Sequence, residues 1–424
     1  MAAKTKWTVL TYIAAHNNLD TFGRRSLNGI LSVGSNSEVV QGALYDGHVG
    51  AGRYVMGEPG MVSSQSQLGS FDSGDPDYLV ATAKWLFTGH PAERYGLVLW
   101  SHGTGWEPGE IEEVAKEARP NSQPNAAESN ERSAMPGSSV LFRPTLRAIL
   151  KPEKPAERAI LFDDGTGHSL DTIELARVTD EIAQAIGQPL DLLGMDACLM
   201  ANIEVAYEIQ RSVGFLVASE ELVPAHSWPY AEVYKSLQDN PEQTAGEFAA
   251  SIVNQYVSYY TASPPAGGDV TKVAFDLSKV DRIVSPVDRV AELFIDSVDT
   301  HADILWSVQH ATRDRETMQG SRSQNKFKFH LWDVGSVIGG LGDSVDSSAE
   351  MKQRCQTAAN SFAPGKGPIL SAGHVGQWFD GTSGFSTYFM PPREQEIAKA
   401  YAQLAYSQKT HWHKMLQAYH QYFN

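Results

Sequence analysis

Short apolar runs separated by helical patterns fill the first half of the chain. The runs are too short for anything but strands, and their near-continuous hydrophobicity is typical of strands buried on both faces of a parallel sheet. Helical periodicity between them predicts an α/β fold, a mainly parallel sheet flanked by helices on both faces. The predicted strands are 8–14, 39–44, 53–56, 95–100, 158–162, 190–195 and 214–218.

The second half of the chain is richer in helical patterns. Long amphipathic stretches cover 242–260, 280–310 and 350–362, and short strand candidates occur at 270–276 and 384–389. We therefore expect two regions, a sheet-containing unit over 1–230 and a helix-rich region over 231–424 packed on that sheet.

A polar excursion interrupts the strand–helix alternation at about 107–158. Its first part is rich in Pro, Asn and Ser, and 141–158 is basic. Such a composition does not bury enough apolar surface to order itself, and an insertion of this length is usually functional or disordered. We expect it to be flexible and open to proteolytic cleavage.

Charge and hydropathy narrow the choice of partners. The 424 residues carry 50 acidic and 34 basic side chains, a net charge of −16, with no basic stripe that would bind phosphates. No apolar run is long enough to span a bilayer, and 7–15 suits a first strand better than a signal peptide. These features predict a cytoplasmic protein that binds neither nucleic acid nor membranes.

Only two cysteines are present, Cys198 and Cys355. This number excludes a disulfide framework and a cysteine-rich zinc site. It suits a reducing compartment, in which a thiol stays available for chemistry.

Two predicted strands end at reactive side chains. The run 97–100 leads to His102, and the run 190–195 leads to Cys198. Neighbouring parallel strands would place both at one edge of the sheet, where α/β active sites lie. An imidazole can take the proton of a thiol and later protonate the leaving amine.

Neighbouring groups add to this prediction. A helix pattern follows Cys198 directly, and a helix N-terminus there would favour a thiolate. The backbone N–H groups of Gly103 and Cys198 would form an oxyanion hole. Taken singly, a cysteine after a strand is most often just buried, and a histidine before glycine is most often a turn residue, so the pair carries the prediction.

Four segments of the sequence make the prediction of a Cys198–His102 pair more specific. They are WTVLTYIAAHNNLD (7–20), YGLVLWSHGTGW (95–106), LLGMDACLMANIEVAYEI (192–209) and VASEELVPAHSWPY (217–230). Together they resemble the clostripain family of cysteine peptidases, relatives of the caspases and gingipains. The resemblance implies a caspase-like fold and a cysteine endopeptidase with His102 and Cys198 as its dyad. Ser101 departs from it, because the family usually has Asp there.

The resemblance also implies cleavage after Arg or Lys in an acidic pocket. Asp196 falls on one acidic position of that pocket, although a strand-end carboxylate can also cap the following helix, and Ser219 lies in the adjoining block. His226 stands where the family usually has a second Asp. A pocket with one carboxylate favours Arg over Lys, because guanidinium is more weakly hydrated and pairs bidentately. A protonated His226 would weaken activity below about pH 6.5.

Activation and metal binding are further expectations from the family. The resemblance implies a zymogen cut between the histidine and cysteine blocks, and often a requirement for calcium. A calcium site cannot be assigned, because the EF-hand spacing is missing and a turn plus a helix cap explains the candidate oxygens equally well. The candidate oxygens belong to Asp163, Asp164, Thr166 and Asp171, and the histidines without a ligand pattern are His16, His168, His226, His411 and His413.

Two alternatives remain beside an Arg-preferring protease. One is an active caspase-like protease with a different residue preference, and the other is a catalytically silent member that serves as a binding or scaffold protein. The expected partners are protein or peptide substrates and, for activation, an upstream protease if the chain does not cut itself.

Overall fold

The computed structural model describes residues 4–106, 160–163, 166–263, 270–317, 327, 329–365, 367–376 and 379–424. Within these ranges the main feature is a nine-stranded sheet of order β10-β8-β7-β6-β5-β1-β2-β3-β4. Its strands are β1 (Thr5–Ala14), β2 (Val39–Gly47), β3 (Gly50–Met56), β4 (Val62–Leu68), β5 (Ala92–Trp100), β6 (Leu190–Asp196), β7 (Val213–Ala218), β8 (Val270–Asp276) and β10 (Ile369–Val375).

The five central strands of this sheet are parallel, as predicted. β2, β1, β5, β6 and β7 run in one direction, while β3 and β4 at one edge and β8 and β10 at the other join the sheet through antiparallel pairs. The sequence pattern missed β4, because this edge strand is solvent-exposed along almost its whole length and has no apolar face. An edge strand can be held by backbone hydrogen bonds to a single neighbouring strand. It therefore need not carry the apolar side chains by which a strand is recognised in the sequence.

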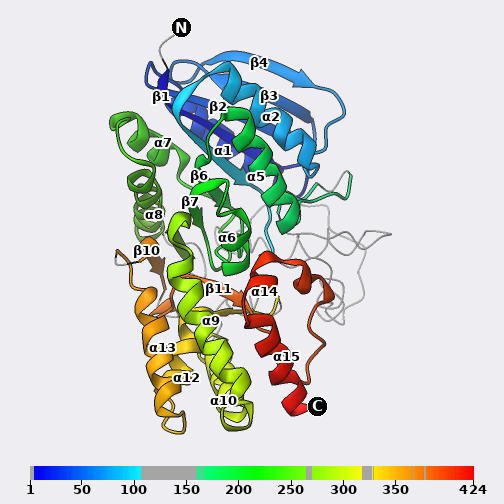
Figure 1. The fold of residues 1–424 in the computed structure, drawn as a ribbon. Coiled ribbons are helices and arrows are strands. Elements are labelled where there is room, and N and C mark those ends of the chain that lie inside the picture. The colour runs from blue at the N-terminus through cyan, green and yellow to red at the C-terminus, as the bar shows by residue number, and fades with distance from the viewer. Residues whose placement is uncertain are drawn as a thin grey trace, which may run out of the picture.

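Helices cover both faces of the sheet, which confirms the α/β prediction (Figure 1). One group packs together as α1 (Asp20–Val33), α7 (Tyr230–Asp239) and α8 (Ala245–Ala262). The other consists of α2 (Pro76–Gly89), α5 (Thr172–Ile186) and α6 (Ile203–Ile209). The strand order reverses at β1, and right-handed crossovers on either side of that point place the groups on opposite faces.

Helix ends follow local sequence signals. Asp75 caps α2 with Pro76 in the first turn, and its carboxylate accepts from the Asp77 N–H. The predicted helix 280–310 is instead two helices, α9 (Asp281–Asp296) and α10 (Val298–Thr317), which break at Ser297. Amphipathic periodicity continues across a single break, so the pattern does not reveal it.

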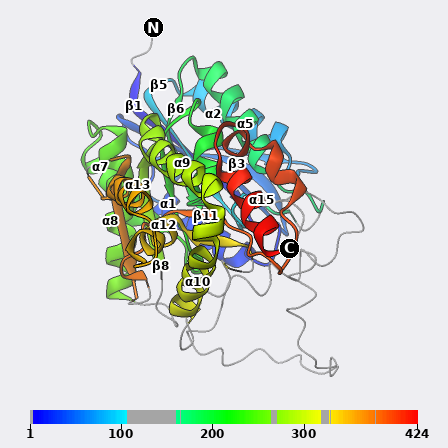
Figure 2. The ribbon, with the colours of Figure 1, turned by 60° about the horizontal axis from the view of Figure 1, so that its bottom comes forward.

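The C-terminal region contributes to the sheet as well as covering it. β8 and β10 belong to the nine-stranded sheet and α8 packs against both, whereas α9, α10 and most of the elements after them lie toward the end of the molecule opposite the N-terminus (Figure 1), which faces forward in Figure 2. The expected division at residue 230 stays a prediction. The remaining elements are η1 (Leu277–Lys279), β9 (Leu331–Asp333), α12 (Val334–Asp343), α13 (Ala349–Ser361), β11 (Ser386–Tyr388), η4 (Lys399–Gln403), α14 (Ala405–Lys409) and α15 (Trp412–Phe423).

A buried glutamate joins the C-terminal region to α6. Oε1 of Glu204 accepts hydrogen bonds from Thr387 Oγ1 at 2.8 Å, the Tyr388 N–H at 3.0 Å and Tyr401 Oη at 2.8 Å. Burial raises the pKa of Glu204 to about 7. Three donors from distant segments therefore converge on one carboxyl group.

Among the described helices, none combines the length and apolarity needed to cross a membrane.

Candidate active site

The sheet register aligns the two predicted catalytic residues. Trp100, the last residue of β5, pairs with Asp196, the last residue of β6, across a parallel ladder. His102 and Cys198 each follow two residues later, so both chains leave the sheet at the same edge and level. Both side chains are buried, with 1% and 4% of their surface exposed. The predicted adjacency of the two strands is therefore confirmed.

Gly103 lies against the backbone of the cysteine loop. A Cβ atom at Gly103 would stand 2.5 Å from the carbonyl oxygen of Cys198. No side chain other than hydrogen fits this approach, which brings together the two main-chain segments expected to bind an oxyanion.

The thiol of Cys198 sits in a fixed turn. The Val223 N–H donates to Sγ at 3.3 Å, and the Leu199 N–H donates to the Glu221 carbonyl at 3.2 Å. Leu199 adopts the left-handed conformation, φ 64°, immediately after the cysteine. Burial raises the pKa of Cys198 to about 12, so the resting group is a thiol.

The expected helix N-terminus at Cys198 is wrong. α6 begins at Ile203, and Asn202 caps it by accepting from the Glu204 and Val205 N–H groups. The intervening residues instead pair with the loop after β7, since the Ala201 N–H donates to the Ser219 carbonyl at 2.9 Å. The helix dipole is therefore too distant and its helix too short to stabilise a thiolate, because the effect falls off within one turn.

Asn18 contacts the imidazole of His102. Its Oδ1 lies 2.9 Å from His102 Nε2, and the Phe162 ring meets the imidazole edge-on at 6.2 Å between centroids. The neighbouring residue Asn17 fixes the backbone of Phe162, because its Nδ2 donates a hydrogen bond to the Phe162 carbonyl at 2.8 Å. Burial lowers the pKa of His102 to about 3, which makes the imidazole neutral. Sequence reasoning missed Asn18, although the turn containing it follows a strand of the same sheet.

Asp196 is buried behind the cysteine loop. Its Oδ2 accepts from Ser227 Oγ, from the Trp228 N–H at 3.2 Å and from Tyr230 Oη at 2.9 Å, whereas its Oδ1 is buried without a hydrogen-bond partner. Burial raises the pKa of this carboxyl, against the opposing effect of Lys272. Asp196 does not cap α6, because Asn202 does; its bonds fix the loop leading into α7 instead.

Lys272 is a charged group in this region that the sequence analysis overlooked. Its Nζ lies 5.0 Å from the centroid of the Trp228 ring and 4.1 Å from that of Tyr256, buried and without a hydrogen-bond partner. Burial lowers the pKa of Lys272 to about 7, while the charges of Asp196 and Cys198 act to raise it. The sequence signal that could have revealed Lys272 is a single lysine within the otherwise mostly apolar strand β8, whose residues are all buried.

The other two predicted pocket residues lie in different surroundings. Ser219 is buried and donates from Oγ to the Thr271 carbonyl at 2.8 Å, which ties the end of β7 to β8. His226 contacts Arg25 through Nδ1 and the Phe22 ring, both on α1. Burial and the Arg25 charge lower the pKa of His226, so this residue gains its charge only at a lower pH than expected.

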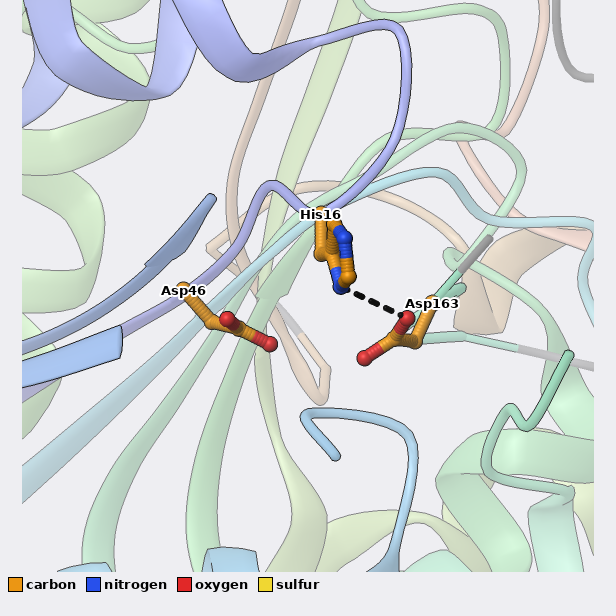
Figure 3. A group of neighbouring side chains, drawn as sticks. All are labelled: His16, Asp46 and Asp163. Carbon is orange, nitrogen blue, oxygen red and sulfur yellow. Dashed lines mark ion pairs between the residues drawn. The ribbon is translucent and has the colours of Figure 1, made fainter. Parts of the chain in front are cut away.

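The residues considered for calcium have different roles in the structure. Asp171 caps α5 in a reciprocal capping box with Glu174, and Thr166 Oγ1 donates to Asp72 at 2.9 Å. Asp163 instead joins His16 and Asp46, and ligand atoms of these three lie within 4.8 Å of one another (Figure 3).

Within the part of the chain that the structure describes, the remaining candidates form no cluster of this kind. His168 pairs with Asp72, His411 with Asp288 and His413 with Ser407. Asp164 and the excursion 107–158 fall outside the described residues.

The class of protein follows from this arrangement. A caspase-like α/β sheet that brings a cysteine and a histidine together at the ends of adjacent strands is the architecture of a cysteine peptidase, whose substrates are proteins or peptides. A profile of the clostripain family matches residues 11–118 and 147–419, and the chain belongs to that family. A search of curated proteins by sequence gave no match.

Solved structures agree with this fold. One is a secreted C11 cysteine protease from Bacteroides thetaiotaomicron in complex with an irreversible peptide inhibitor, 16% identical, with a TM-score of 0.60 over 98% of this chain and 99% of that one. Another is an inactive zymogen C11 protease from Parabacteroides distasonis, 15% identical, with a TM-score of 0.62 over 97% and 99% of the two chains.

Proposed function

We propose that this peptidase is an endopeptidase that uses Cys198 as nucleophile and His102 as proton carrier. The observation that carries the proposal is the pairing of Trp100 with Asp196, which brings the two residues out of the sheet side by side. Neutral forms of both groups in the buried resting state mean that the proton must move when the substrate arrives.

The chemistry then runs through an acyl-enzyme. Asn18 accepts from Nε2–H of His102, so Nδ1 is the atom that takes the proton from Sγ. Sγ attacks the carbonyl carbon, and the N–H groups of Gly103 and Cys198 bind the oxyanion. The imidazolium returns the proton to the leaving amine, and water hydrolyses the thioester.

The preference for Arg over Lys at the cleaved bond rests on Asp196. Its unpartnered Oδ1 is the acceptor that a substrate guanidinium would meet. Lys272 opposes this attraction, since its ammonium stands near the same carboxylate. We infer that Lys272 sets how strongly the pocket selects a basic side chain.

Activation by cleavage is part of the proposal. Burial of both reacting side chains is what a closed precursor would show, and one structural relative is described as an inactive zymogen. The basic stretch 143–158 offers sites for the chain itself or for an upstream protease. Intact-mass analysis of active enzyme should reveal a cut within 107–158; an active, uncut chain would contradict the requirement.

Substitution tests the dyad. Cys198→Ala should abolish peptide cleavage and covalent labelling by a chloromethylketone, and His102→Ala should reduce both severely, because the thiol loses its base. Cys355→Ala is the matched control, since that buried thiol lies on α13. Cleavage by the Cys198→Ala protein at the wild-type rate would overturn the proposed function.

A further inference from the structure

Three side chains from separate parts of the chain converge beside the active site. His16 follows β1, Asp46 lies near the end of β2, and Asp163 follows the excursion (Figure 3). His16 Nδ1 lies 3.1 Å from Asp163 Oδ1, and the ligand atoms of all three fall within 4.8 Å of one another. In Figure 3 the Asp46 carboxylate points toward the space between the other two.

Burial makes this arrangement costly without a cation. Asp46 and Asp163 are 3% and 2% exposed, and Oδ2 of Asp46 is buried with no hydrogen-bond partner. Two buried carboxylates facing each other repel, and one half-buried histidine neutralises at most one of them. Asp163 also accepts hydrogen bonds from the Ser73 N–H at 3.2 Å, from Ser73 Oγ at 3.4 Å and from the Thr166 N–H at 3.2 Å, but these donors carry no positive charge. The space therefore favours a positively charged ligand.

We propose that His16, Asp46 and Asp163 bind a divalent first-row transition metal ion such as Mn²⁺ or Zn²⁺. One imidazole with two carboxylates suits these ions. Ligand atoms that share one such ion at about 2.0–2.2 Å lie within roughly 4.4 Å of each other, so small rotations of these side chains are sufficient.

Calcium, which the family resemblance implied, fits this site poorly. Ca²⁺ takes six to eight oxygen ligands, whereas this cluster offers an imidazole nitrogen and two carboxylates. Of the other oxygens considered, those of Asp171 and Thr166 lie in described residues, and they already serve a helix cap and a hydrogen bond to the Asp72 side chain.

The position of the ion gives it a structural role. His16 directly precedes Asn17 and Asn18, and Asp163 directly follows Phe162; those neighbours hold the His102 imidazole and its surroundings. The ligands also come from both sides of the excursion, so a bound ion would tie together the two fragments of a cleaved chain. The metal would stabilise the loops around His102 without touching the reacting atoms.

Metal binding can be measured without catalysis, on the full chain carrying Cys198→Ala. Elemental analysis of purified protein should find close to one transition-metal ion per chain. After chelation, Mn²⁺ and Zn²⁺ should each raise the melting temperature, and calorimetric titration should show one site that prefers both ions to Ca²⁺. Since the chain is inactive, these results do not depend on the proposed function.

Asp46→Asn separates a metal site from a purely structural cluster. The amide removes a charged ligand but preserves shape, so Mn²⁺ affinity should fall on the order of 100-fold, while the metal-free variant should melt no lower than metal-free wild type because the repulsion is gone. Asp288→Asn, which alters a His–Asp pair elsewhere, should bind Mn²⁺ normally. His16→Gln, at a half-buried position, provides a second ligand variant if Asp46→Asn does not fold.

Three results would overturn the proposal. One is an unchanged melting temperature with Mn²⁺ and Zn²⁺; another is equal Mn²⁺ affinity in wild type and the ligand variant. Tighter binding of Ca²⁺ than of Mn²⁺ would overturn the choice of ion.

Discussion

The amide oxygen of Asn18 lies 2.9 Å from Nε2 of His102, which joins the loop after β1 to the loop after β5. In the proposed mechanism this contact would select the tautomer that leaves the other ring nitrogen free to accept the thiol proton. Asn18 is solvent-exposed, so its removal should cost little stability. It acts through His102 and is a positioning residue.

We predict that Asn18→Ala lowers kcat by roughly 10- to 100-fold with a small change in KM, since proton transfer alone contributes about 10²–10⁴. Asn18→Asp keeps the hydrogen-bond acceptor, so it should recover part of the rate. Its negative charge should raise the pKa of His102 and move the acidic limb of the pH–rate profile to higher pH. Asn36→Ala, in a turn remote from the site, is the control. Wild-type kcat in Asn18→Ala would exclude this role.

If Asp196 lines the substrate pocket as proposed, Lys272 should make the selection of basic substrates depend on pH. Its pKa of about 7 means that the ammonium is charged below neutrality and loses its proton above it. The ratio of kcat/KM for Arg to that for neutral citrulline should therefore rise between pH 6 and pH 8, because competition for Asp196 declines.

Lys272→Met should raise this ratio about 10-fold at pH 6 and remove its pH dependence, since one nearby charge is absent at every pH. Lys279→Met, which removes a surface lysine paired with Asp276, should leave the ratio unchanged. Steady-state kinetics with matched peptides, or their affinities for Cys198→Ala protein, provide the measurement. An unaltered ratio in Lys272→Met would show that the lysine does not influence the pocket.

Gly103→Ala should damage the oxyanion site. The added methyl group would stand 2.5 Å from the Cys198 carbonyl oxygen, so the two backbone segments must separate. Loss of one aligned oxyanion donor costs about 10²–10³ in kcat. Gly89→Ala, where a Cβ meets nothing within 4 Å, is the control. A Gly103→Ala enzyme with wild-type kcat would contradict the proposed oxyanion geometry.

Glu204 should make stability fall as pH rises. Its folded-state pKa of about 7 exceeds the ordinary value of 4.5. Between pH 4.5 and pH 7, Glu204 is therefore protonated in the folded chain and ionised in the unfolded chain. The contribution is complete below pH 4.5 and is lost as pH passes 7, up to about 3 kcal/mol in all.

Glu204→Gln keeps a neutral side chain and the Oε1 acceptor at every pH. Its free energy of unfolding in urea should match wild type near pH 5 and exceed it at pH 8. The control is Glu181→Gln, at a partly exposed position of α5. Its free energy of unfolding should differ from that of wild type by the same amount at both pH values. Parallel pH dependence in Glu204→Gln and wild type would refute the assignment.

The sequence by itself determined the parallel core and placed the two candidate catalytic residues just beyond the ends of neighbouring strands. Strands such as 95–100 and 190–195 are visible because burial on both faces produces continuous apolar runs, and His102 and Cys198 are placed at strand ends by that local pattern alone. The start of α6 was placed too early, because the pattern does not show that residues 199–201 pair with the loop after β7.

Only the tertiary structure decided which side chains surround the dyad. Asn18 and His102 are 84 positions apart, and they meet because β1 lies next to β5 in the strand order. Lys272 comes close to Asp196 because β8 adds to the edge beyond β7, and Asp46 comes close to His16 because β2 lies beside β1. Periodicity reports only which side of its own element a residue occupies, whereas these contacts depend on the order in which the strands pair.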